Sequence, residues 1–269
     1  MDGRISEEKK LTSIAQYLLF LRHQKAYIFA GTKEFCLDKT VLEYGCGNGY
    51  GSALLAKIAK KVTAVDINQR VIDHCKQKYQ TDNLSFDVIT PETKTHFADQ
   101  SFDLIVSFQV IEHVHNVKGY LNELKRVLKD DGVLIITTPN RGYRLYPFQK
   151  PVNPYHIREY NQNSLSKQLR AVFDQITILG ISGTEEINQI ERKRVNKSLL
   201  NALLRYPLKR LLATLTPRLI KKRNMAPKKE KILPTEEAER FNHYSEENYK
   251  IIAENLTTSL DFLALLRKN

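Results

Sequence analysis

Short apolar runs alternate along this chain with longer segments in which apolar residues recur at helical spacing. Each apolar run is followed by a turn signal or by a helical segment. Strands that alternate with helices in this way favour a parallel sheet covered by helices on both faces. The pattern predicts strands near residues 40–44, 62–66, 84–88, 102–108 and 132–138, and helices near residues 50–60, 68–79 and 117–129.

The same pattern continues toward both ends of the chain. Residues 11–30 have the spacing of an amphipathic helix, which is expected to close over the ligand side of the sheet. Residues 164–171 are predicted to be helical, and residues 175–180 to form a sixth strand. Ligands bind such sheets at the carboxyl ends of the strands, so residues at those ends are the first candidates for a site.

Residues 41–51 combine a strand, a turn and the start of a helix. Apolar residues lead to an acid, and glycine then recurs at every second position, at Gly45, Gly47 and Gly49. Glycine tolerates positive φ angles and lets the backbone approach a ligand closely. The start of a helix adds unpaired N–H groups and a positive dipole end. The turn therefore indicates a site for a nucleotide-like cofactor.

Two classes of cofactor compete for this turn. A dinucleotide fingerprint needs Gly-x-Gly-x-x-Gly, but the third glycine position holds Tyr50 or Ser52, depending on the register. Asp66 ends the next strand, where a ribose-binding carboxylate is expected; the alternative is that it caps the following helix. Glu43 would repel a pyrophosphate but suits an ammonium group, unless it is only a strand-end acid. S-Adenosylmethionine has an ammonium group and no phosphate, so the turn favours it.

Two further segments resemble one protein family. Residues 101–114 resemble the fourth-strand signature of class I S-adenosylmethionine-dependent methyltransferases of the type 11 and type 23 kind, and residues 124–140 resemble their helix, turn and fifth strand. With the glycine turn, the matching motifs span roughly residues 41–165. The resemblance implies an α/β fold with a Rossmann-like, seven-stranded, mostly parallel sheet, helices on both faces and an antiparallel last strand. It also implies S-adenosylmethionine as the cofactor.

In this family the last strand returns beside the sixth, and residues 259–266 are the candidate for it. Residues 183–256 would then be an insert between the two final strands. Prolines divide this insert into short pieces and argue against a long helix there; they are Pro207, Pro217, Pro227 and Pro234. The predicted organisation is an N-terminal helical cap (1–35), a methyltransferase core (36–182 plus 257–269) and a basic helical insert (183–256).

The resemblance also assigns residues to the cofactor. Asp87 would accept a hydrogen bond from the adenine amine, unless it is only a strand-end acid, and Ile67 or Val88 would pack on the adenine ring. Gln109 would hydrogen-bond the cofactor or the acceptor. The residues predicted to bind S-adenosylmethionine are Glu43, Gly45, Cys46, Gly47, Gly49, Asp66, Ile67, Asp87, Val88 and Gln109.

Acceptor chemistry is expected on the ligand side of the sheet, after the fifth strand. Residues 153–160 resemble a segment of methyltransferases that act in bacterial glycan and lipid-linked glycan synthesis. His156 is the first candidate for a general base, because an imidazole titrates near neutrality and can take a hydroxyl proton; a structural loop histidine is the alternative. His113 is the second catalytic candidate. Tyr155 would shape the acceptor pocket, and Glu112 would line its mouth.

No metal is expected at this site. Some relatives, including quinone-pathway and small-RNA methyltransferases, place Glu-x-x-Glu-His at the end of the fourth strand and bind a divalent cation. This chain has Gln109 at the first position of that motif, ahead of Glu112 and His113. A neutral amide is a poorer ligand for hard cations than a carboxylate.

Composition places the chain among ordinary globular proteins. Of its 269 residues, 42% are hydrophobic and 27% charged, and it lacks the run of about 20 apolar residues that a membrane span needs. Cys36, Cys46 and Cys75 form no metal-like pair and are odd in number, which favours a reducing compartment. Charged residues precede the first apolar run, so no signal peptide is indicated. A cytoplasmic location is expected.

The net charge of +12 comes from one segment. Residues 191–231 contain fourteen lysines and arginines and two glutamates, so the rest of the chain is neutral. Leucines recur between these basic residues, and the first interpretation is a lid whose leucines pack on the domain. The alternative is that these pieces lie on an anionic membrane surface, here the inner face of the membrane. Because the rest of the chain carries no excess of positive charge, nucleic acid is the least favoured partner.

The sequence therefore predicts a methyltransferase that acts on a small or lipid-linked acceptor, first of all on an oxygen of a glycan or related metabolite. One alternative acceptor is a quinone or other isoprenoid lipid at the membrane surface. Another is RNA, with the basic insert binding its phosphates. A module that binds S-adenosylmethionine without turnover is the fourth alternative. The acceptor, the methylated atom and the oligomeric state do not follow from the sequence.

Overall fold

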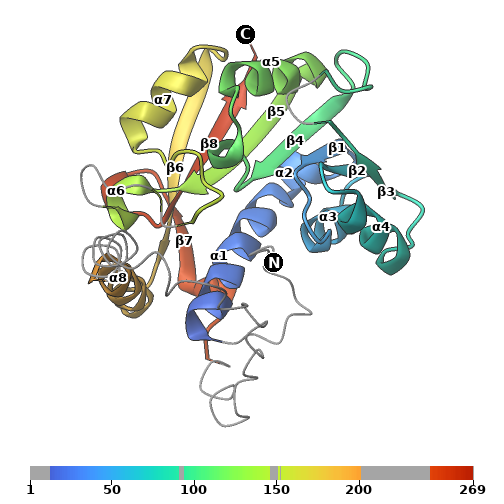
Figure 1. The fold of residues 1–269 in the computed structure, drawn as a ribbon. Coiled ribbons are helices and arrows are strands. Elements are labelled where there is room, and N and C mark those ends of the chain that lie inside the picture. The colour runs from blue at the N-terminus through green and yellow to red at the C-terminus, as the bar shows by residue number, and fades with distance from the viewer. Residues whose placement is uncertain (1–12, 91–93, 146–150, 152, 201–242, 269) are drawn as a thin grey trace, which may run out of the picture.

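The computed structural model describes residues 13–90, 94–145, 151, 153–200 and 243–268, with side chains described up to Lys193 in the helix that ends at Leu200. Eight described strands form one sheet in the order β3-β2-β1-β4-β5-β8-β6-β7 (Figure 1). In chain order they are β1 (Thr40–Tyr44), β2 (Lys61–Asp66), β3 (Leu84–Val88), β4 (Phe102–Phe108), β5 (Leu128–Pro139), β6 (Gln175–Gly183), β7 (Tyr249–Ile252) and β8 (Asp261–Arg267).

Strands β1 to β5 pair in parallel, so their carboxyl ends lie at one edge of the sheet. Strand β8 runs antiparallel between β5 and β6, and Leu265 faces Ile135 on one side and Thr177 on the other. This confirms the predicted antiparallel strand at the C-terminus. Strand β6 therefore runs in the same direction as β5, and its carboxyl end lies on the same side of the sheet as the carboxyl ends of β1 to β5.

The sheet has eight strands rather than the predicted seven. The additional strand β7 pairs antiparallel with β6 at the edge of the sheet and lies inside the segment 183–256, which was predicted to be a helical insert. A four-residue run is too short for periodicity to distinguish a strand from a helix. Tertiary packing holds it in place: Tyr249 is buried, and its hydroxyl donates to the Leu18 carbonyl at 2.7 Å.

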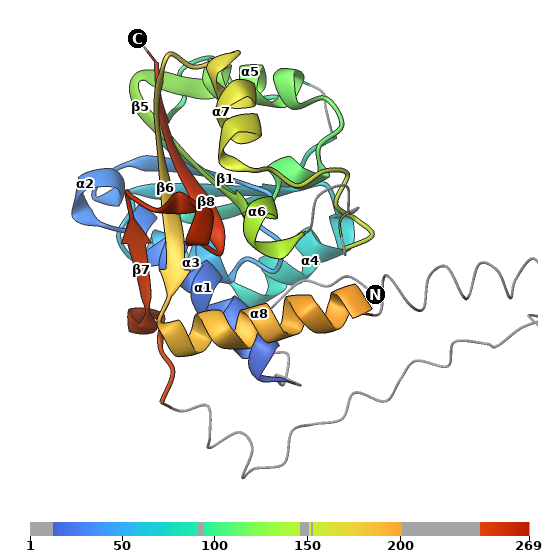
Figure 2. The same ribbon diagram turned by 90° about the vertical axis from the view of Figure 1, so that its left-hand side faces the viewer.

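Helices cover both faces of the sheet, as predicted (Figure 2). Along β1, Val41 joins a core with α1, α3 and α4, whereas the next residue, Leu42, joins a second core with α5 and α7, because successive side chains on a strand point to opposite faces. The helices are α1 (Ile14–Ala30), α2 (Lys33–Cys36), α3 (Tyr50–Ala56), α4 (Gln69–Lys78), α5 (Val117–Val127), α6 (Arg141–Arg144), α7 (Gln162–Arg170) and α8 (Glu185–Leu200), with short 3-10 turns η1 (Ile111–His113), η3 (Glu246–Asn248) and η4 (Leu256–Thr258).

The predicted N-terminal helix is α1, whose first turn is capped by the Ser13 side chain. It packs on the start of α3, where an added Cβ at Gly51 would lie 2.0 Å from Cζ of Tyr27. The Tyr27 ring also meets the rings of Tyr50 and Phe108, at centroid distances of 5.2 and 4.8 Å. Helix α1 therefore packs against residues that flank the glycine turn.

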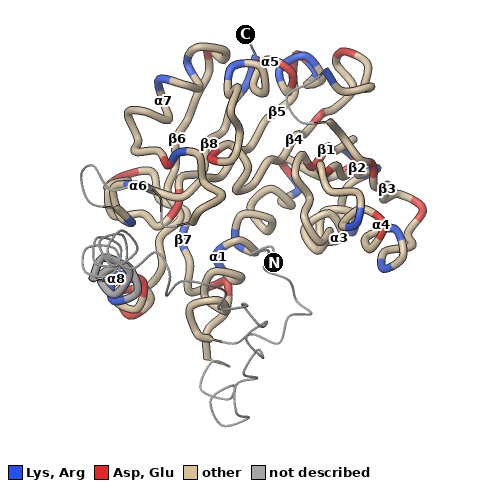
Figure 3. Tube along the Cα trace, viewed as in Figure 1, with Lys and Arg blue, Asp and Glu red and all other residues tan. Residues whose placement is uncertain are grey.

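Helix α8 contradicts the expectation that the insert holds no long helix. It has 16 residues and ends before Pro207, the first of the prolines on which that expectation rested. Residues 201–242, which include most of the basic segment 191–231, lie outside the described residues. Among the described helices none is long and apolar enough to cross a membrane. Along the described trace, basic and acidic residues are interspersed (Figure 3).

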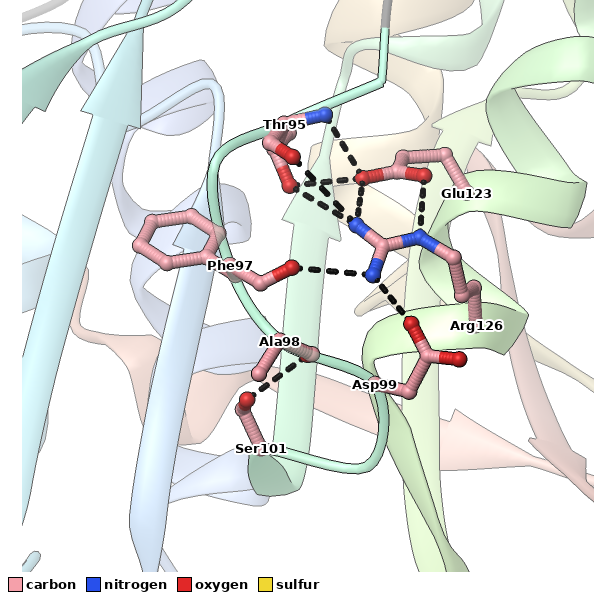
Figure 4. A network of polar contacts seen from close by, with 7 residues as sticks. All are labelled: Thr95, Phe97, Ala98, Asp99, Ser101, Glu123 and Arg126. Atoms are coloured by element: carbon pink, nitrogen blue, oxygen red, sulfur yellow. Dashed lines mark hydrogen bonds and ion pairs between the residues drawn. The ribbon is translucent and has the colours of Figure 1, made fainter.

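Arg126 fixes the connection that leads into β4 (Figure 4). From α5 its guanidinium donates to both carboxylate oxygens of Glu123, at 2.8 and 2.6 Å, to Asp99 at 2.6 Å and to the Phe97 carbonyl at 2.8 Å. Glu123 in turn accepts from the backbone N–H of Thr95 at 2.8 Å. Three charged side chains thus attach the segment before β4 to α5.

Candidate functional site

The glycine turn connects β1 to α3 with backbone angles that favour glycine. Gly45, Gly47 and Gly49 have φ angles of +89°, +53° and +77°. An added Cβ at Gly45 would lie 2.4 Å from Cγ2 of Val110, so this position also lacks space for a side chain. The alternating glycines thus have the structural cause expected from the sequence: a tight turn at the carboxyl end of β1.

Asp66 lies directly beside this turn, at the end of β2. Its buried carboxylate accepts from the backbone N–H of Gly47 at 3.0 Å and from that of Asn68 at 3.0 Å. The residue that caps α4 is Asn68, whose side chain accepts from the Arg70 N–H, so Asp66 is not the helix cap. Its position next to the glycine turn is where a ribose would lie; that role stays a prediction.

Glu43 points into the protein rather than toward solvent. Its side chain is buried and accepts hydrogen bonds from the Tyr27 hydroxyl at 2.5 Å and from the Ser52 hydroxyl. Burial raises the pKa of Glu43 to about 7, against the opposing effect of the two hydroxyl groups. Glu43 therefore links β1 to α1 and α3, and its predicted role toward an ammonium group stays a prediction. Tyr27 was not identified from the sequence, because a tyrosine in an amphipathic helix carries no sign of its partner.

Two exposed apolar side chains mark the ends of β2 and β3. Ile67 is 56% exposed and Val88 is 37% exposed, and Val88 pairs in register with Asp66, the residue before Ile67. Exposed aliphatic side chains on adjacent strand ends can cover the two sides of a flat ring, as predicted for adenine. Asp87 lies 3.9 Å from Nζ of Lys76 on α4, with about half of its side chain exposed.

Gln109 follows β4 with an unusual backbone and a defined side-chain position. Its φ is +57°, a left-handed value that is uncommon for a residue with a side chain. Its amide nitrogen lies 3.3 Å from Oγ1 of Thr137 and 3.3 Å from Oδ2 of Asp261, so the amide group points toward β5 and β8. Asp261 also pairs with the buried Arg22 of α1, at 2.9 Å. This link between α1 and β8 joins residues that are far apart in the chain and is not visible in the sequence pattern.

His156 is paired with a buried carboxylate. Its Nδ1 lies 2.8 Å from Oε1 of Glu159, whose side chain is fully buried. Burial would raise the pKa of Glu159, but the hydrogen bond from His156 and the charge of Arg144 outweigh it, and the net pKa is lowered. An ionised Glu159 holds the proton of His156 on Nδ1 and leaves a lone pair on Nε2. Glu159 was missed from the sequence, although its spacing of three residues from His156 was a usable signal.

Glu112 and His113 approach His156 from η1. The His113 ring lies 4.8 Å from the His156 ring, and its Nδ1 lies 2.8 Å from the Tyr155 carbonyl, which can only accept. Glu112 is fully buried; Oε2 accepts from the Thr138 hydroxyl at 3.0 Å, and Oε1 has no hydrogen-bond partner among the residues that the structure describes. Burial raises the pKa of Glu112 to about 8. The side chain of Tyr155 is 59% exposed.

Glu112, His113 and His156 fit a divalent cation. Each offers one ligand atom, and the three atoms lie within 4.8 Å of one another. A carboxylate and two imidazoles are suitable ligands for ions such as Zn²⁺, Mn²⁺ or Fe²⁺. The expectation of no metal rested on Gln109, whose amide points elsewhere, and did not include His156, which the chain brings in from the segment after β5.

The predicted residues thus form two neighbouring groups. The cofactor candidates lie at the carboxyl ends of β1, β2 and β3, and the acceptor candidates lie on η1 and on residues 153–160. Val110 touches the glycine turn, and η1 begins at the next residue. Gln109 differs from the other cofactor candidates, because its amide bonds toward β8.

Comparison with known proteins finds similar methyltransferases. Residues 42–136 match a family described as a methyltransferase domain. The chain is 35% identical over 164 residues to a probable S-adenosylmethionine-dependent methyltransferase of Mycobacterium tuberculosis, a match that covers 60% of this chain and 58% of that protein. It is 28% identical over 176 residues to a ubiquinone biosynthesis O-methyltransferase of Bartonella tribocorum, covering 60% and 71%. The chain therefore spans less than two thirds of the first relative.

Solved structures show the fold. A protein of Thermotoga maritima described as a SAM-dependent methyltransferase and possible histamine N-methyltransferase has a TM-score of 0.55 at 16% identity, over 95% of this chain and 96% of that one. The [4+2]-cyclase SpnF has a TM-score of 0.54 at 14% identity, over 91% and 80%. At these identities the likeness is one of fold, and the two names show that this fold hosts more than one reaction.

Proposed function

We propose that this chain, whose residues 42–136 belong to the methyltransferase-domain family, transfers a methyl group from S-adenosylmethionine to an oxygen of a small or lipid-linked acceptor. One observation carries the proposal: the glycine turn, which Asp66 holds, contacts Val110, and His113 of the following turn η1 contacts His156, which is paired with the buried Glu159. The curated relatives named as S-adenosylmethionine-dependent or O-methyltransferases support it.

The donor side is assigned by the chemistry of its groups. Asp66 would accept hydrogen bonds from the ribose hydroxyls while it holds the turn. Glu43 lies close enough to the turn to attract the ammonium group electrostatically, although its own oxygens are bonded to Tyr27 and Ser52. Ile67 and Val88 would cover the adenine ring. Bound S-adenosylmethionine would supply a methyl group that its sulfonium already activates.

The acceptor side is assigned to the pair of His156 and Glu159. Nε2 of His156 would take the proton of an acceptor hydroxyl as the oxygen forms its bond to the methyl carbon. Glu159 would stabilise the imidazolium that results and keep the ring oriented. The methyl–sulfur bond breaks as the new bond forms, and its electron pair stays on sulfur, which gives S-adenosylhomocysteine. Positioning of the two reactants contributes much of the acceleration, because the leaving group is already good.

A cation bound by Glu112, His113 and His156 would polarise an acceptor oxygen as a Lewis acid. The same Nε2 of His156 cannot be both a base and a ligand, so the two uses exclude each other. We assign His156 the base role, because its Nδ1 is bonded to the buried Glu159 and its Nε2 is left to face an acceptor.

A quinone or related isoprenoid phenol is the second candidate acceptor. The Bartonella relative is named as a ubiquinone biosynthesis O-methyltransferase. Tyr155 and Ile157 expose apolar side chains, 59% and 38% exposed, next to His156. With a lipid acceptor, contact between residues 191–231 and a membrane would bring the enzyme to its substrate. That membrane contact stays a prediction, and most of this segment lies outside the described residues.

The proposal is tested by supplying the purified chain with S-adenosylmethionine labelled in its methyl group, together with fractionated cell extract. The expected result is a labelled product whose methyl group is bound to oxygen, as determined by mass spectrometry and NMR. Label on nitrogen or carbon would contradict the assignment to oxygen. Label on RNA would favour an RNA methyltransferase, and bound cofactor without label transfer to any fraction would favour a non-catalytic module.

A further inference from the structure

Two buried thiols meet beneath the glycine turn. Cys46 belongs to the turn and Cys75 to α4, and neither side chain is more than 4% exposed. Both donate to the same backbone carbonyl, that of Gly47, with Sγ to oxygen distances of 3.7 Å for Cys46 and 3.5 Å for Cys75. The interaction between the two thiols is also the largest cause of their pKa shifts, which raise the pKa of Cys46 and lower that of Cys75. The fold thus brings a turn residue and a helix residue together as a thiol pair.

The glycine turn packs directly against the Cys75 side chain. An added Cβ at Gly49 would lie 2.9 Å from Sγ of Cys75, so no space separates them. On its other side the turn borders solvent, since Gly45, Gly47 and Asn48 are partly exposed. A small oxidant can therefore approach the turn when no ligand covers it.

We propose that Cys46 and Cys75 form an oxidation site that controls donor binding: a peroxide joins them in a disulfide, and the disulfide weakens the binding of S-adenosylmethionine to the glycine turn. The formation of the disulfide depends only on the thiol pair. Its effect on the donor rests on the proposed function.

The chemistry needs two thiols and one peroxide. The Cys75 thiolate attacks a peroxide oxygen, the O–O bond breaks, and a sulfenic acid forms as the other oxygen leaves as water or an alcohol. The Cys46 sulfur then attacks the Cys75 sulfur, an S–S bond forms, and the S–O bond breaks with loss of water. Each sulfur is oxidised by one electron, and the peroxide accepts both electrons.

Cys75 is the better first nucleophile of the two. The hydrogen bond from Cys46 lowers the pKa of the Cys75 thiol despite the opposing effect of burial, and the charge of Lys78 lowers it further. Cys36 provides the contrast within the same chain. It is buried against the Leu55 carbonyl, and burial raises the pKa of its thiol to about 11.

A disulfide at this place would change the contacts of the turn. A sulfur–sulfur bond is about 2.05 Å long, whereas both thiols now donate to the Gly47 carbonyl. Joining them removes both donors from that carbonyl and draws Cys46 toward α4. The Gly47 N–H, which now bonds Asp66, moves with it. By linkage, a ligand bound to the turn opposes disulfide formation to the same extent as the disulfide opposes the ligand.

The test treats the purified full chain with stoichiometric hydrogen peroxide, alkylates the remaining thiols and maps peptides by mass spectrometry. The expected result is a peptide pair cross-linked through Cys46 and Cys75, with Cys36 alkylated. Calorimetry is then expected to show S-adenosylhomocysteine binding at least tenfold more weakly to the oxidised chain, with full recovery after dithiothreitol. S-Adenosylhomocysteine added before the peroxide should slow the cross-link.

Cys36→Ser is the matched control and should respond to peroxide as the unaltered chain does. Cys75→Ser and Cys75→Ala should bind S-adenosylhomocysteine equally well with and without peroxide; the two variants together allow for one that fails to fold. Separately alkylated Cys46 and Cys75 after peroxide would overturn the oxidation site. A cross-link with unchanged affinity would overturn the control of binding. A reduced chain that does not bind S-adenosylhomocysteine would instead refute the proposed donor site, whatever the cross-link shows.

Discussion

The Tyr27 hydroxyl donates a 2.5 Å hydrogen bond to Oε1 of Glu43 and thereby joins the N-terminal helix to the strand that precedes the glycine turn. The Tyr27 ring also occupies the space over Gly51, where no side chain fits. Helix α1 therefore contacts both the strand that precedes the glycine turn and the helix that follows it. A change at Tyr27 should affect both the stability of the fold and the binding of the donor.

Tyr27→Phe is expected to destabilise the folded chain by about 1–3 kcal/mol, because it leaves a buried carboxylate oxygen without one of its partners. The affinity for S-adenosylhomocysteine should fall as well, since α1 and the turn then share one contact fewer. Urea unfolding and calorimetry measure the two effects. Tyr155→Phe, at an exposed tyrosine, is the control and should change the free energy of unfolding by less than about 0.5 kcal/mol. Equal stability of the two variants would contradict the linking role of Tyr27.

Donor binding is expected to depend on pH through Glu43. Burial raises the pKa of Glu43 to about 7, so below that pH the free chain carries a neutral group there. An ammonium group favours the charged carboxylate, so donor affinity should rise as pH increases through about 7, with release of a proton on binding. Calorimetry between roughly pH 6 and 8 measures this. In Glu43→Gln the rise should be absent; the same rise in this variant would assign it to another group.

His156→Ala is expected to reduce kcat by about 10²–10⁴-fold, the range of a general base, while donor affinity stays unchanged. Glu159→Gln should cause a smaller loss of kcat, because Glu159 orients the His156 ring through the hydrogen bond to Nδ1. His115→Ala, at an exposed histidine nearby, is the control. A normal kcat in His156→Ala would contradict the base assignment and favour alignment alone as the cause of turnover.

Zn²⁺ is expected to bind the unaltered chain and to lower its turnover, because Glu112, His113 and His156 can hold the ion. Since Nδ1 of His156 is bonded to Glu159, the ion would occupy Nε2. His113→Ala should bind Zn²⁺ more weakly in calorimetry and resist inhibition. Chelators should leave turnover unchanged. Turnover that is abolished by a chelator and restored by a divalent cation would contradict the base mechanism and favour a metal-assisted one.

The sequence predicted the order and the type of most elements, because apolar periodicity and the glycine turn report on local structure. Strand β7 was missed because its four residues gain their place only by pairing with β6 and by the burial of Tyr249. Helix α8 was missed because the expectation of no long helix rests on prolines from Pro207 onward, and these all follow the helix in the chain.

The candidate site was predictable where it consists of consecutive motif residues and not where it depends on pairs from distant segments. Gly45 and Asp66 belong to short motifs whose spacing is visible in the chain. The partnership of Tyr27 with Glu43, and that of Arg22 with Asp261, joins residues from different elements, and only the fold brings them together. Glu159 is an intermediate case. Its spacing of three residues from His156 is visible in the sequence, but that spacing alone does not show that the two side chains interact.

The donor assignment is tested most directly by calorimetric titration of S-adenosylhomocysteine and of NAD⁺ into the unaltered chain, Asp66→Ala and Asp73→Ala. The unaltered chain is expected to bind one S-adenosylhomocysteine and no NAD⁺. Asp66→Ala should bind it at least tenfold more weakly, because the variant loses the carboxylate that holds the turn and would hold the ribose. Asp73→Ala, which alters an acid on the neighbouring helix α4, should bind it normally. The donor assignment would be contradicted by binding of NAD⁺ in preference to S-adenosylhomocysteine. It would also be contradicted if Asp66→Ala bound S-adenosylhomocysteine as tightly as the unaltered chain does.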